Sequence, residues 1–222
     1  MNSIIPKVKI CCISSIKEAQ LAIKAGANAL GLVGHMPSGP GVISDELIAK
    51  IAAQVPAGIE TFLLTSETKV DDIIKHHQQT KTTTIQLVDE LKQGTYHDLR
   101  NALPDVNLVQ VIHVLGEETI EEALEASANV DYLLLDSGNP NLAIKELGGT
   151  GRVHNWDISK RIVELSDLPV FLAGGLRPEN VEKAIQTVQP YGLDLCSGVR
   201  TEGLLDVKKL EAFFKGVKEN KK

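Results

Sequence analysis

The feature that most constrains the fold of this chain is a regular alternation of short apolar runs with amphipathic stretches along its 222 residues. A short apolar run bounded by polar residues is typical of a strand buried on both faces, and the amphipathic stretches are typical of covering helices. The apolar runs are Val8 to Ile13, Ala29 to Val33, Ile59 to Leu64, Thr83 to Leu87, Leu108 to Val114, Tyr132 to Leu135, Pro169 to Leu172 and Gly192 to Cys196. Eight repeats of strand and helix indicate parallel βαβ units and favour a closed (β/α)8 barrel, or TIM barrel, over an open sheet.

The stretches between the runs carry the boundary signals of helices. Ser44 precedes Asp45 and Glu46, which is the order of an N-cap followed by acidic residues in the first turn. Gly26 stands where the first helix should end in a left-handed residue. No linker or change in composition separates a second unit, so we expect residues 1–222 to form a single barrel domain. The expected helices are Ile16 to Ala25, Asp45 to Gln54, Val70 to Gln79, Tyr96 to Ala102, Thr119 to Ala126, Ile158 to Leu165, Asn180 to Val188 and Val207 to Val217.

The composition argues against several classes of protein. The formal net charge is -6 and no basic stripe is visible, which argues against a surface that binds nucleic acid. No apolar stretch approaches the roughly 20 residues needed to span a bilayer. The three cysteines do not make a complete disulfide framework, and the residues Met1-Asn2-Ser3 lead almost directly into the first apolar run. We therefore expect a cytoplasmic protein without a signal peptide.

Three glycine-rich turns crowd the second half of the chain, and each follows an apolar run. Glycine permits positive φ and close approach of the backbone to a ligand, and bunched backbone N–H groups bind anions. Such barrels commonly hold a phosphate at the loops after the seventh and eighth strands. We therefore predict that the three turns bind one phosphate, whereas the alternative is that each is an ordinary tight turn. The candidate phosphate-binding residues are Gly149, Thr150, Gly151, Gly174, Gly175, Ser197 and Gly198.

A thiol and a carboxyl group stand near the ends of two well-separated strands. Cys11 and Cys12 lie near the end of the first run, where adjacent strand residues point to opposite faces, and Asp136 follows the sixth run. Catalytic groups of these barrels lie at such carboxyl ends. A thiolate can take a proton from carbon and a buried aspartic acid can donate one, so Cys11 and Asp136 are the candidate catalytic pair of an isomerase. The alternative is a buried core cysteine and an aspartate that caps a turn.

The connection after the sixth run is long and polar. Residues 137–155 contain Pro140 and the first glycine turn, and loops of this length in compact domains are usually functional or disordered. We expect an active-site loop here. No metal site is predicted, because His76 and His77 are adjacent on an expected helix and do not share a face.

Several segments resemble the phosphoribosylanthranilate isomerase family. Lys9-Ile10-Cys11 is similar to the Lys-Ile-Cys-Gly opening of those proteins, and the longest similar segment runs from Leu172 to Val181. The resemblance spans nearly the whole chain. The other similar segments are Ala25 to Gly31, Leu134 to Ser137, Gly148 to Gly151, Pro190 to Asp194 and Ser197 to Val199.

The resemblance implies a barrel of the ribulose-phosphate-binding type that catalyses an Amadori rearrangement in tryptophan biosynthesis. N-(5'-phosphoribosyl)anthranilate becomes 1-(2-carboxyphenylamino)-1-deoxyribulose 5-phosphate, with no metal and no organic cofactor. By this resemblance, Cys11 is the general base that takes the proton from C2 of the sugar, and Asp136 is the general acid that protonates the ring oxygen. The three glycine turns hold the phosphate. We expect a phosphorylated sugar as the partner, no nucleic acid and no membrane, and a monomer or a homodimer.

The chain departs from the family on the side that faces the anthranilate. Gly41 stands where the family has an arginine that faces the anthranilate carboxylate, Val88 stands in place of a histidine and Gln110 in place of a lysine. Cys12 replaces a glycine, and Arg200 replaces a glutamate. The phosphate side is kept, while the aromatic-acid side is altered.

The departures leave three hypotheses open. A hydrogen bond to a charged group contributes about 1.5–3 kcal/mol, so losing the arginine weakens substrate binding roughly 10- to 150-fold unless another cation replaces it. Arg152 and Arg200 are the candidates for that cation. Alternatively the chain is a paralogue that acts on a different phosphosugar, or a non-catalytic barrel that binds a phosphorylated metabolite.

Overall fold

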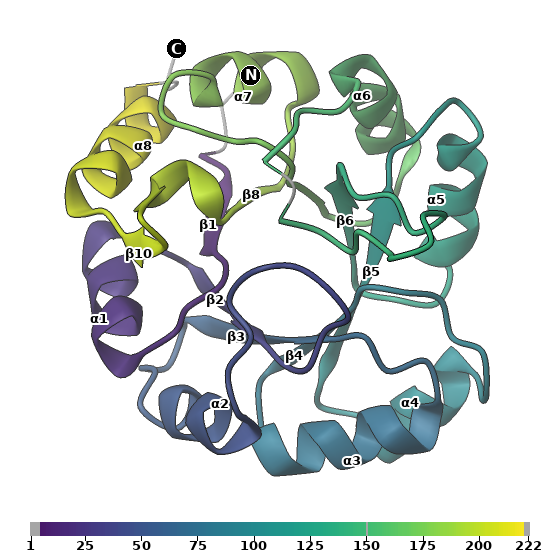
Figure 1. Cartoon of the computed structure of the whole chain (residues 1–222). Helices are drawn as coiled ribbons and strands as arrows, with labels where there is room; N and C mark the ends of the chain where they lie inside the picture. Colours follow the sequence, from purple (N-terminus) through teal and green to yellow (C-terminus); the bar gives the residue numbers. More distant parts are fainter. Residues whose placement is uncertain (1–4, 150, 220–222) are drawn as a thin grey trace.

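A closed parallel barrel of eight strands forms the centre of the protein in this computed structural model, which describes residues 5–149 and 151–219. The strands are β1 (Lys7–Ile10), β2 (Ala29–Val33), β3 (Glu60–Thr65), β4 (Thr84–Leu87), β5 (Asn107–His113), β6 (Tyr132–Asp136), β7 (Val170–Leu172) and β8 (Gly192–Leu195). Each strand pairs with the next, and β1 pairs with β8 from Lys7↔Gly192 to Ile10↔Leu195, which closes the ring. The predicted (β/α)8 fold is confirmed, and Figure 1 views the barrel along its axis.

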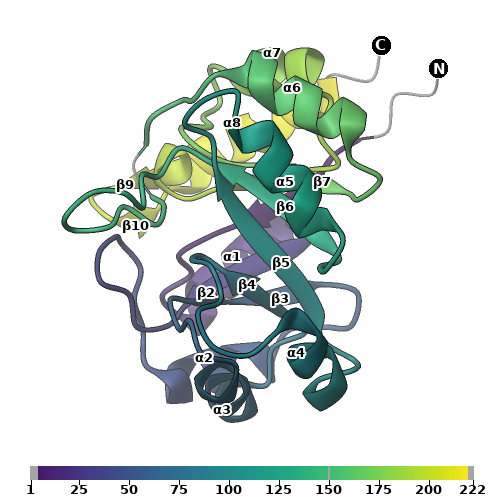
Figure 2. The same ribbon diagram turned by 90° about the vertical axis from the view of Figure 1, so that its right-hand side faces the viewer.

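Helices follow the strands in turn and cover the outside of the barrel (Figures 1 and 2). Ser44 caps its helix by accepting a hydrogen bond from the N–H of Leu47, and Gly26 ends the first helix with a left-handed φ of 116°. After β8 the chain adds a 3-10 turn, η1 (Ser197–Val199), and a hairpin of β9 (Arg200–Thr201) and β10 (Leu204–Leu205). The helices are α1 (Ile16–Ala25), α2 (Asp45–Ala52), α3 (Val70–Thr80), α4 (Tyr96–Ala102), α5 (Thr119–Ser127), α6 (Trp156–Leu165), α7 (Val181–Val188) and α8 (Val207–Glu219).

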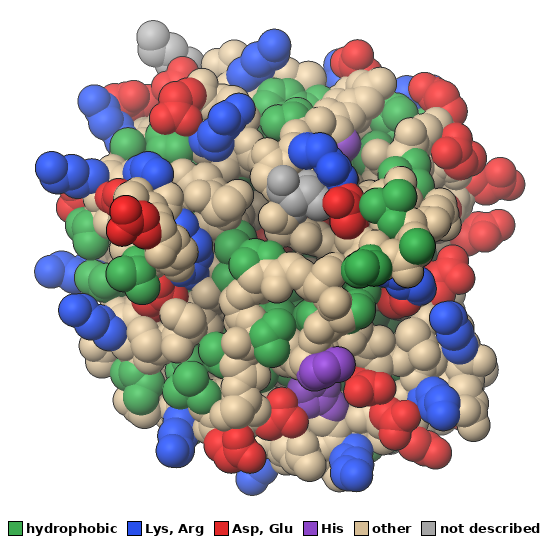
Figure 3. All heavy atoms as spheres, in the orientation of Figure 1, with side chains coloured by type: hydrophobic (Ala, Val, Ile, Leu, Met, Phe, Trp, Pro, Cys, Tyr) green, Lys and Arg blue, Asp and Glu red, His purple; other side chains and the backbone are tan. Residues whose placement is uncertain are grey.

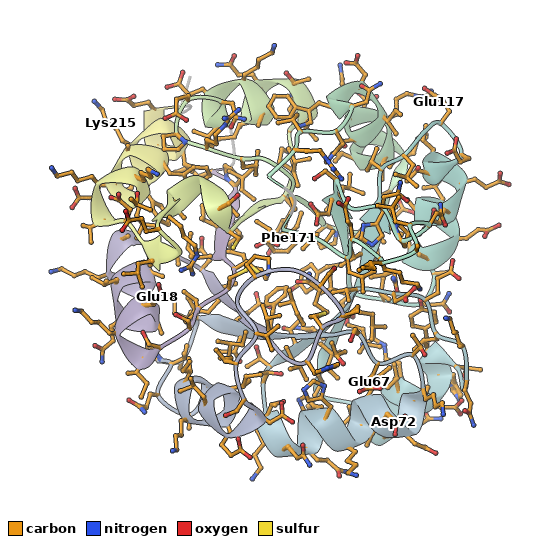
Figure 4. All side chains as sticks on the ribbon, viewed as in Figure 1. Glu18, Glu67, Asp72, Glu117, Phe171 and Lys215 are labelled. Atoms are coloured by element: carbon orange, nitrogen blue, oxygen red, sulfur yellow. The ribbon has the colours of Figure 1, made fainter. Side chains whose placement is uncertain are left out.

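Alternation along the strands divides the apolar side chains between two cores. In β3, Phe62 and Leu64 belong to the core inside the barrel, whereas Leu63 packs in the core between strands and helices. The rings of Phe62 and Phe171 meet edge to face with centroids 5.9 Å apart, and Phe171 lies near the barrel centre in Figure 4. Because these side chains fill the interior of the barrel, a ligand has room at the mouth of the barrel, where the carboxyl ends of the strands lie.

Two loops meet over the carboxyl ends of the strands. The loop of residues 34–44 arches over the centre of the barrel in Figure 1, and the loop of residues 137–155 lies beside it. The Ser38 hydroxyl donates a hydrogen bond to the carbonyl of Lys145 at 2.5 Å, and the Lys145 ammonium pairs with Asp89 after β4. These contacts join the loops that follow β2, β4 and β6 around one opening.

Charged side chains gather around the perimeter of this face, and backbone and apolar side chains occupy most of its middle (Figure 3). Over residues 5–149 and 151–219, no helix combines the length and the apolar character that crossing a bilayer requires.

Candidate active site

A pocket of about 730 Å³, open to solvent, lies at the carboxyl ends of the barrel strands. Cys11, Asp136 and residues of all three glycine turns line it. The candidate acid, the candidate base and the candidate phosphate turns therefore share one cavity.

Cys11 and Cys12 lie in the loop after β1 and not in the strand, because β1 ends at Ile10. The N–H of Cys11 donates to the carbonyl of Leu195 at 2.8 Å, but Cys12 adopts a left-handed φ of 61°. The prediction that the two side chains point to opposite faces is wrong, since both are buried and both line the pocket. The left-handed residue turns the chain and interrupts the strand alternation on which that prediction depended.

Asp136 ends β6 and is 7% exposed. Its Oδ1 accepts a hydrogen bond from the N–H of Ser137 at 2.7 Å. Its Oδ2 faces Gly148 so closely that a Cβ at that glycine would lie 2.8 Å away. Burial raises the pKa of the Asp136 carboxyl, against the opposing effects of the Ser137 N–H and His113. A carboxyl held this way retains its proton at higher pH than an exposed one, as a general acid requires.

Lys9 is fully buried beside the pocket-lining residue Asp194, with its Nζ 2.9 Å from Asp194 Oδ2 and 5.2 Å from the centre of the Phe62 ring. Burial lowers the pKa of Lys9, but attraction to Asp194 and then to Cys11 outweighs it and holds the pKa above its ordinary value. Gly31 of β2 leaves the space, because a Cβ there would lie 2.7 Å from Cys11 Sγ and 3.1 Å from Lys9 Nζ. A fixed positive charge therefore lies beneath the Cys11 side chain.

The three glycine turns pack directly on one another. A Cβ at Gly175 would lie 2.7 Å from the carbonyl carbon of Arg152, which joins the second turn to the first. A Cβ at Gly198 would lie 1.9 Å from the carbonyl oxygen of Leu176, which joins the third turn to the second. Positive φ values of 81° at Gly174 and 63° at Gly175 give the backbone a shape that other residues adopt only with strain.

Most of the predicted site residues lie together in this region. Gly149, Gly151, Gly174, Gly175 and Ser197 line the pocket. Gly198 lies behind Ser197 against Leu176, so its place is in the packing of the turns. Thr150 lies outside the described residues.

Sequence reasoning missed two further residues that line the pocket, Gln86 of β4 and Cys196 after β8. Gln86 is 3% exposed, and its Oε1 is buried without a hydrogen-bond partner in the described part of the chain. The available signal for Gln86 was its place near the end of the fourth run, between Ile85 and Leu87. For Cys196 the signal was its place directly before the turn that begins at Ser197.

The departures from the family pattern differ in their distance from the pocket. Val88 lines it, whereas Gln110 turns outward and accepts a hydrogen bond from the Tyr96 hydroxyl of α4 at 2.8 Å. The side chain of Arg152 pairs with Glu146 and is 58% exposed. Arg200 binds Glu18 and the carbonyls of the loop after β1. Neither arginine is among the described residues that line the pocket.

Comparison with known proteins gives a consistent result over nearly the full length. The family model for N-(5'phosphoribosyl)anthranilate (PRA) isomerase matches residues 8–216. N-(5'-phosphoribosyl)anthranilate isomerase 2 of Methanosarcina mazei is 34% identical over 216 residues, covering 96% of this chain and 95% of that protein. The N-(5'-phosphoribosyl)anthranilate isomerase of Methanosarcina acetivorans is 33% identical over 226 residues, covering 96% and 93%. A crystal structure of phosphoribosyl anthranilate isomerase from Thermotoga maritima superimposes with a TM-score of 0.79 at 25% identity, covering 96% and 99%.

Proposed function

The chain belongs to the N-(5'-phosphoribosyl)anthranilate isomerase family, and we propose that Cys11 and Asp136 are the acid–base pair of its reaction. It is an isomerase of tryptophan biosynthesis that converts N-(5'-phosphoribosyl)anthranilate to 1-(2-carboxyphenylamino)-1-deoxyribulose 5-phosphate. The observation that carries the assignment of roles is the single pocket that Cys11, Asp136 and the glycine turns line together.

The reaction needs one proton donor and one proton acceptor at different atoms of the sugar. Asp136 donates its proton to the ring oxygen as the bond from that oxygen to C1 breaks, which leaves an iminium group between C1 and the anthranilate nitrogen. The Cys11 thiolate then takes the proton from C2, and the electron pair of that C–H bond forms the enolamine. Cys11 returns its proton to C1 while the C2 hydroxyl loses its proton, which yields the ketose, and that second proton restores the acid form of Asp136. The raised pKa of Asp136 supports the role of donor, since its carboxyl keeps a proton to give.

The glycine turns after β6, β7 and β8 hold the phosphate in this proposal. Positive φ at Gly149, Gly151, Gly174 and Gly175 allows backbone N–H groups to approach an anion that side chains would otherwise keep away. The turns line the pocket on the side of β6 to β8, while Cys11 enters it from β1. A phosphate fixed there sets the distance at which the sugar carbons meet the two catalytic groups.

The other side of the pocket receives the aromatic ring. Val33, Met36, Leu64 and Val88 line it with apolar surface suited to a benzene ring. Gln86 lines the same pocket, and in this proposal its side-chain amide forms a hydrogen bond with the substrate near the anthranilate nitrogen. Buried acceptors without partners are rare, which supports a hydrogen bond that forms only with substrate.

Turnover of freshly prepared N-(5'-phosphoribosyl)anthranilate tests the assignment. We expect Cys11→Ser and Asp136→Asn each to lower kcat about 10²–10⁴-fold while the melting temperature stays near that of the parent. The matched control is Asp131→Asn, because Asp131 lies just before β6 at the opposite end of the barrel and pairs with Arg100 at 2.8 Å. That variant should lose stability and keep kcat.

Full activity in Cys11→Ser or in Asp136→Asn would remove that residue from the mechanism. A folded parent protein that turns the substrate over no faster than the uncatalysed reaction would overturn the proposal as a whole.

A further inference from the structure

A buried ion pair joins the first and the last strand of the barrel, close to the proposed base. Lys9 of β1 and Asp194 of β8 are register partners, and Lys9 Nζ lies 2.9 Å from Asp194 Oδ2. Lys9 is 0% exposed and Asp194 is 7% exposed. Both side chains point into the barrel, because the residues before and after them pack in the core between strands and helices, namely Val8, Ile10, Leu193 and Leu195. The roles proposed for Cys11 and Asp136 leave this ion pair unused.

Stability alone does not account for two charges inside the barrel. Taking an ammonium and a carboxylate out of water costs free energy that their mutual attraction seldom exceeds, and apolar residues of similar volume are often at least as stable in such a place. Apolar groups do fill the surroundings, since Lys9 Nζ lies 5.2 Å from the centre of the Phe62 ring. A charged pair in this apolar interior therefore indicates a task other than stability.

The carboxylate of Asp194 has one oxygen left for a ligand. Lys9 takes Oδ2, whereas Oδ1 is buried without a hydrogen-bond partner in the part of the chain that the structure describes. Asp194 lines the pocket. Buried polar atoms without partners are rare, and an ionised carboxylate can only accept hydrogen bonds. The structure therefore offers an acceptor to a hydroxyl or N–H group of the ligand.

The pairing with Lys9 makes this carboxylate compatible with the thiolate chemistry beside it. Burial lowers the pKa of Lys9, but attraction to Asp194 and then to Cys11 outweighs burial, so the ammonium keeps its proton. A Cβ at Gly31 would lie 3.1 Å from Lys9 Nζ and 2.7 Å from Cys11 Sγ, so the ammonium and the thiol border the same small space. A positive charge near both groups allows a carboxylate and a thiolate to share one cavity.

The proposed mechanism leaves one hydroxyl of the sugar without a partner. Asp136 protonates the ring oxygen, which becomes the C4 hydroxyl when the ring opens. Cys11 acts at C2, and the C2 hydroxyl later returns a proton to Asp136. The phosphate is carried on C5. The C3 hydroxyl is therefore the sugar group to which neither catalytic residue is assigned.

Asp194 lies on the path that leads from the phosphate turns to Cys11. It precedes Ser197, which begins the third glycine turn, and its strand β8 is the neighbour of β1, which leads to Cys11 (Figure 1). A sugar that extends from the phosphate to Cys11 therefore brings C3 past Asp194. In the closed ribose ring the C3 hydroxyl and the C2 proton lie on opposite faces. Ring opening frees rotation about the bond between C2 and C3, so that both can then face the side of β8 and β1.

We propose that the Asp194 carboxylate, paired with Lys9, accepts a hydrogen bond from the C3 hydroxyl of the open-chain sugar. Asp194 touches the substrate in this scheme, and Lys9 is a positioning residue because it acts only through Asp194. The hydrogen bond selects sugars with a hydroxyl at C3 and favours the open chain over the closed ring. The inference rests on the proposed roles of Cys11, Asp136 and the glycine turns.

Binding of two open-chain probes tests the contact without turnover. The first probe is reduced 1-(2-carboxyphenylamino)-1-deoxyribulose 5-phosphate, and the second is the same molecule without the oxygen at C3. We expect calorimetric titration of the parent to give a Kd about 10- to 150-fold higher for the 3-deoxy probe, since the hydroxyl bonds to a charged group. Equal Kd values for the two probes in the parent would overturn the proposal, whatever the variants show.

Two double variants connect this discrimination to the ion pair. Lys9→Met with Asp194→Leu removes both charges and leaves no buried ion unpaired, and its ratio of the two Kd values should fall to within about twofold of unity. Lys9→Met with Asp194→Asn keeps a neutral acceptor, so its ratio should recover to about 2- to 10-fold. A purely structural ion pair would change both Kd values alike. A ratio that stays at the parent value in the first variant would therefore refute the contact.

Lys7→Met is the matched control, because Lys7 is an exposed lysine of the same strand. Its ratio of Kd values should equal that of the parent, and a ratio that falls here as well would overturn the assignment to the buried pair. Turnover separates this inference from the proposed function. A parent that does not turn over N-(5'-phosphoribosyl)anthranilate refutes the proposed roles of Cys11 and Asp136, whereas turnover together with equal Kd values for the two probes refutes the contact at Asp194 alone.

Discussion

Gly41 packs directly against Cys12, and a Cβ at position 41 would lie 2.5 Å from the Cβ of Cys12. The phosphoribosylanthranilate isomerase pattern has glycine where this chain has Cys12 and arginine where it has Gly41. By that resemblance, the two departures are in direct contact with each other, one in the loop after β1 and the other in the loop after β2.

The contact predicts that Gly41→Ala destabilises the protein through both strain and overlap. The φ of Gly41 is 85°, and a non-glycine residue there costs about 1–3 kcal/mol before any contact is counted. Adding Cys12→Gly should recover the part that comes from overlap, a coupling of about 0.5 kcal/mol or more in a double-mutant cycle of urea unfolding. Gly58→Ala is the control, since Gly58 has φ of 90° and open space around it. A coupling of zero would show that overlap contributes nothing.

Gly198→Ala should weaken phosphate binding and spare the chemistry. The new Cβ would overlap the carbonyl oxygen of Leu176, so the second and third glycine turns must separate. We expect KM for substrate and the inhibition constant of inorganic phosphate to rise together by about tenfold or more, with kcat little changed. Gly203→Ala, which meets open space in the neighbouring hairpin, should leave both constants unchanged. A fall in kcat at constant KM would contradict the phosphate role.

Gln86→Leu should lower kcat/KM without a loss of stability. In the proposed complex its side-chain amide forms a hydrogen bond with the substrate, and such a bond contributes about 0.5–1.5 kcal/mol, or roughly 2- to 10-fold. Gln110→Leu is the matched control, because it breaks the bond to Tyr96 outside the barrel and should cost stability alone. Equal kcat/KM values for the parent and Gln86→Leu would exclude contact between Gln86 and the substrate.

His154 should make the protein less stable as the pH falls below neutrality. Burial lowers the pKa of His154 from 6.5 to about 4, so between these values the unfolded chain binds a proton that the folded chain does not. The free energy of unfolding then falls with decreasing pH, by at most about 1.4 kcal/mol per pH unit from this group. His154→Gln should flatten that slope in urea unfolding. Identical slopes for the parent and the variant would rule out a depressed pKa at His154.

The barrel and the common location of the two catalytic candidates follow from the sequence because parallel strands all finish at one edge. Cys11 and Asp136 each stand at the end of an apolar run, and that placement alone brings them to one opening. The expected helix from Tyr96 to Ala102 is confirmed. Thr95 and Asp98 form a capping box at its start, and the spacing of apolar residues alone does not indicate this box.

The geometry of the thiols could not be predicted from the pattern. The apolar run continues to Ile13 although β1 ends at Ile10, because burial continues after pairing with β2 has stopped. Cysteine is not a residue type that predicts a left-handed backbone, so the conformation of Cys12 could not be predicted from its identity. Arg200 was a candidate for the carboxylate of the substrate, but its long side chain turns to the buried carboxylate of Glu18, a partner 182 residues away in sequence.

The pairing of β1 with β8 has a consequence for biosynthesis. The strand that leads to Cys11 leaves the ribosome before the other seven barrel strands, and its partner from Gly192 to Leu195 leaves after them. Until then the nascent chain presents two unpaired strand edges, at β1 and at β7, and unpaired edges promote association between chains. Only after residue 195 has been added can the carbonyl of Leu195 accept the N–H of Cys11 at 2.8 Å, so the loop that carries Cys11 is fixed last.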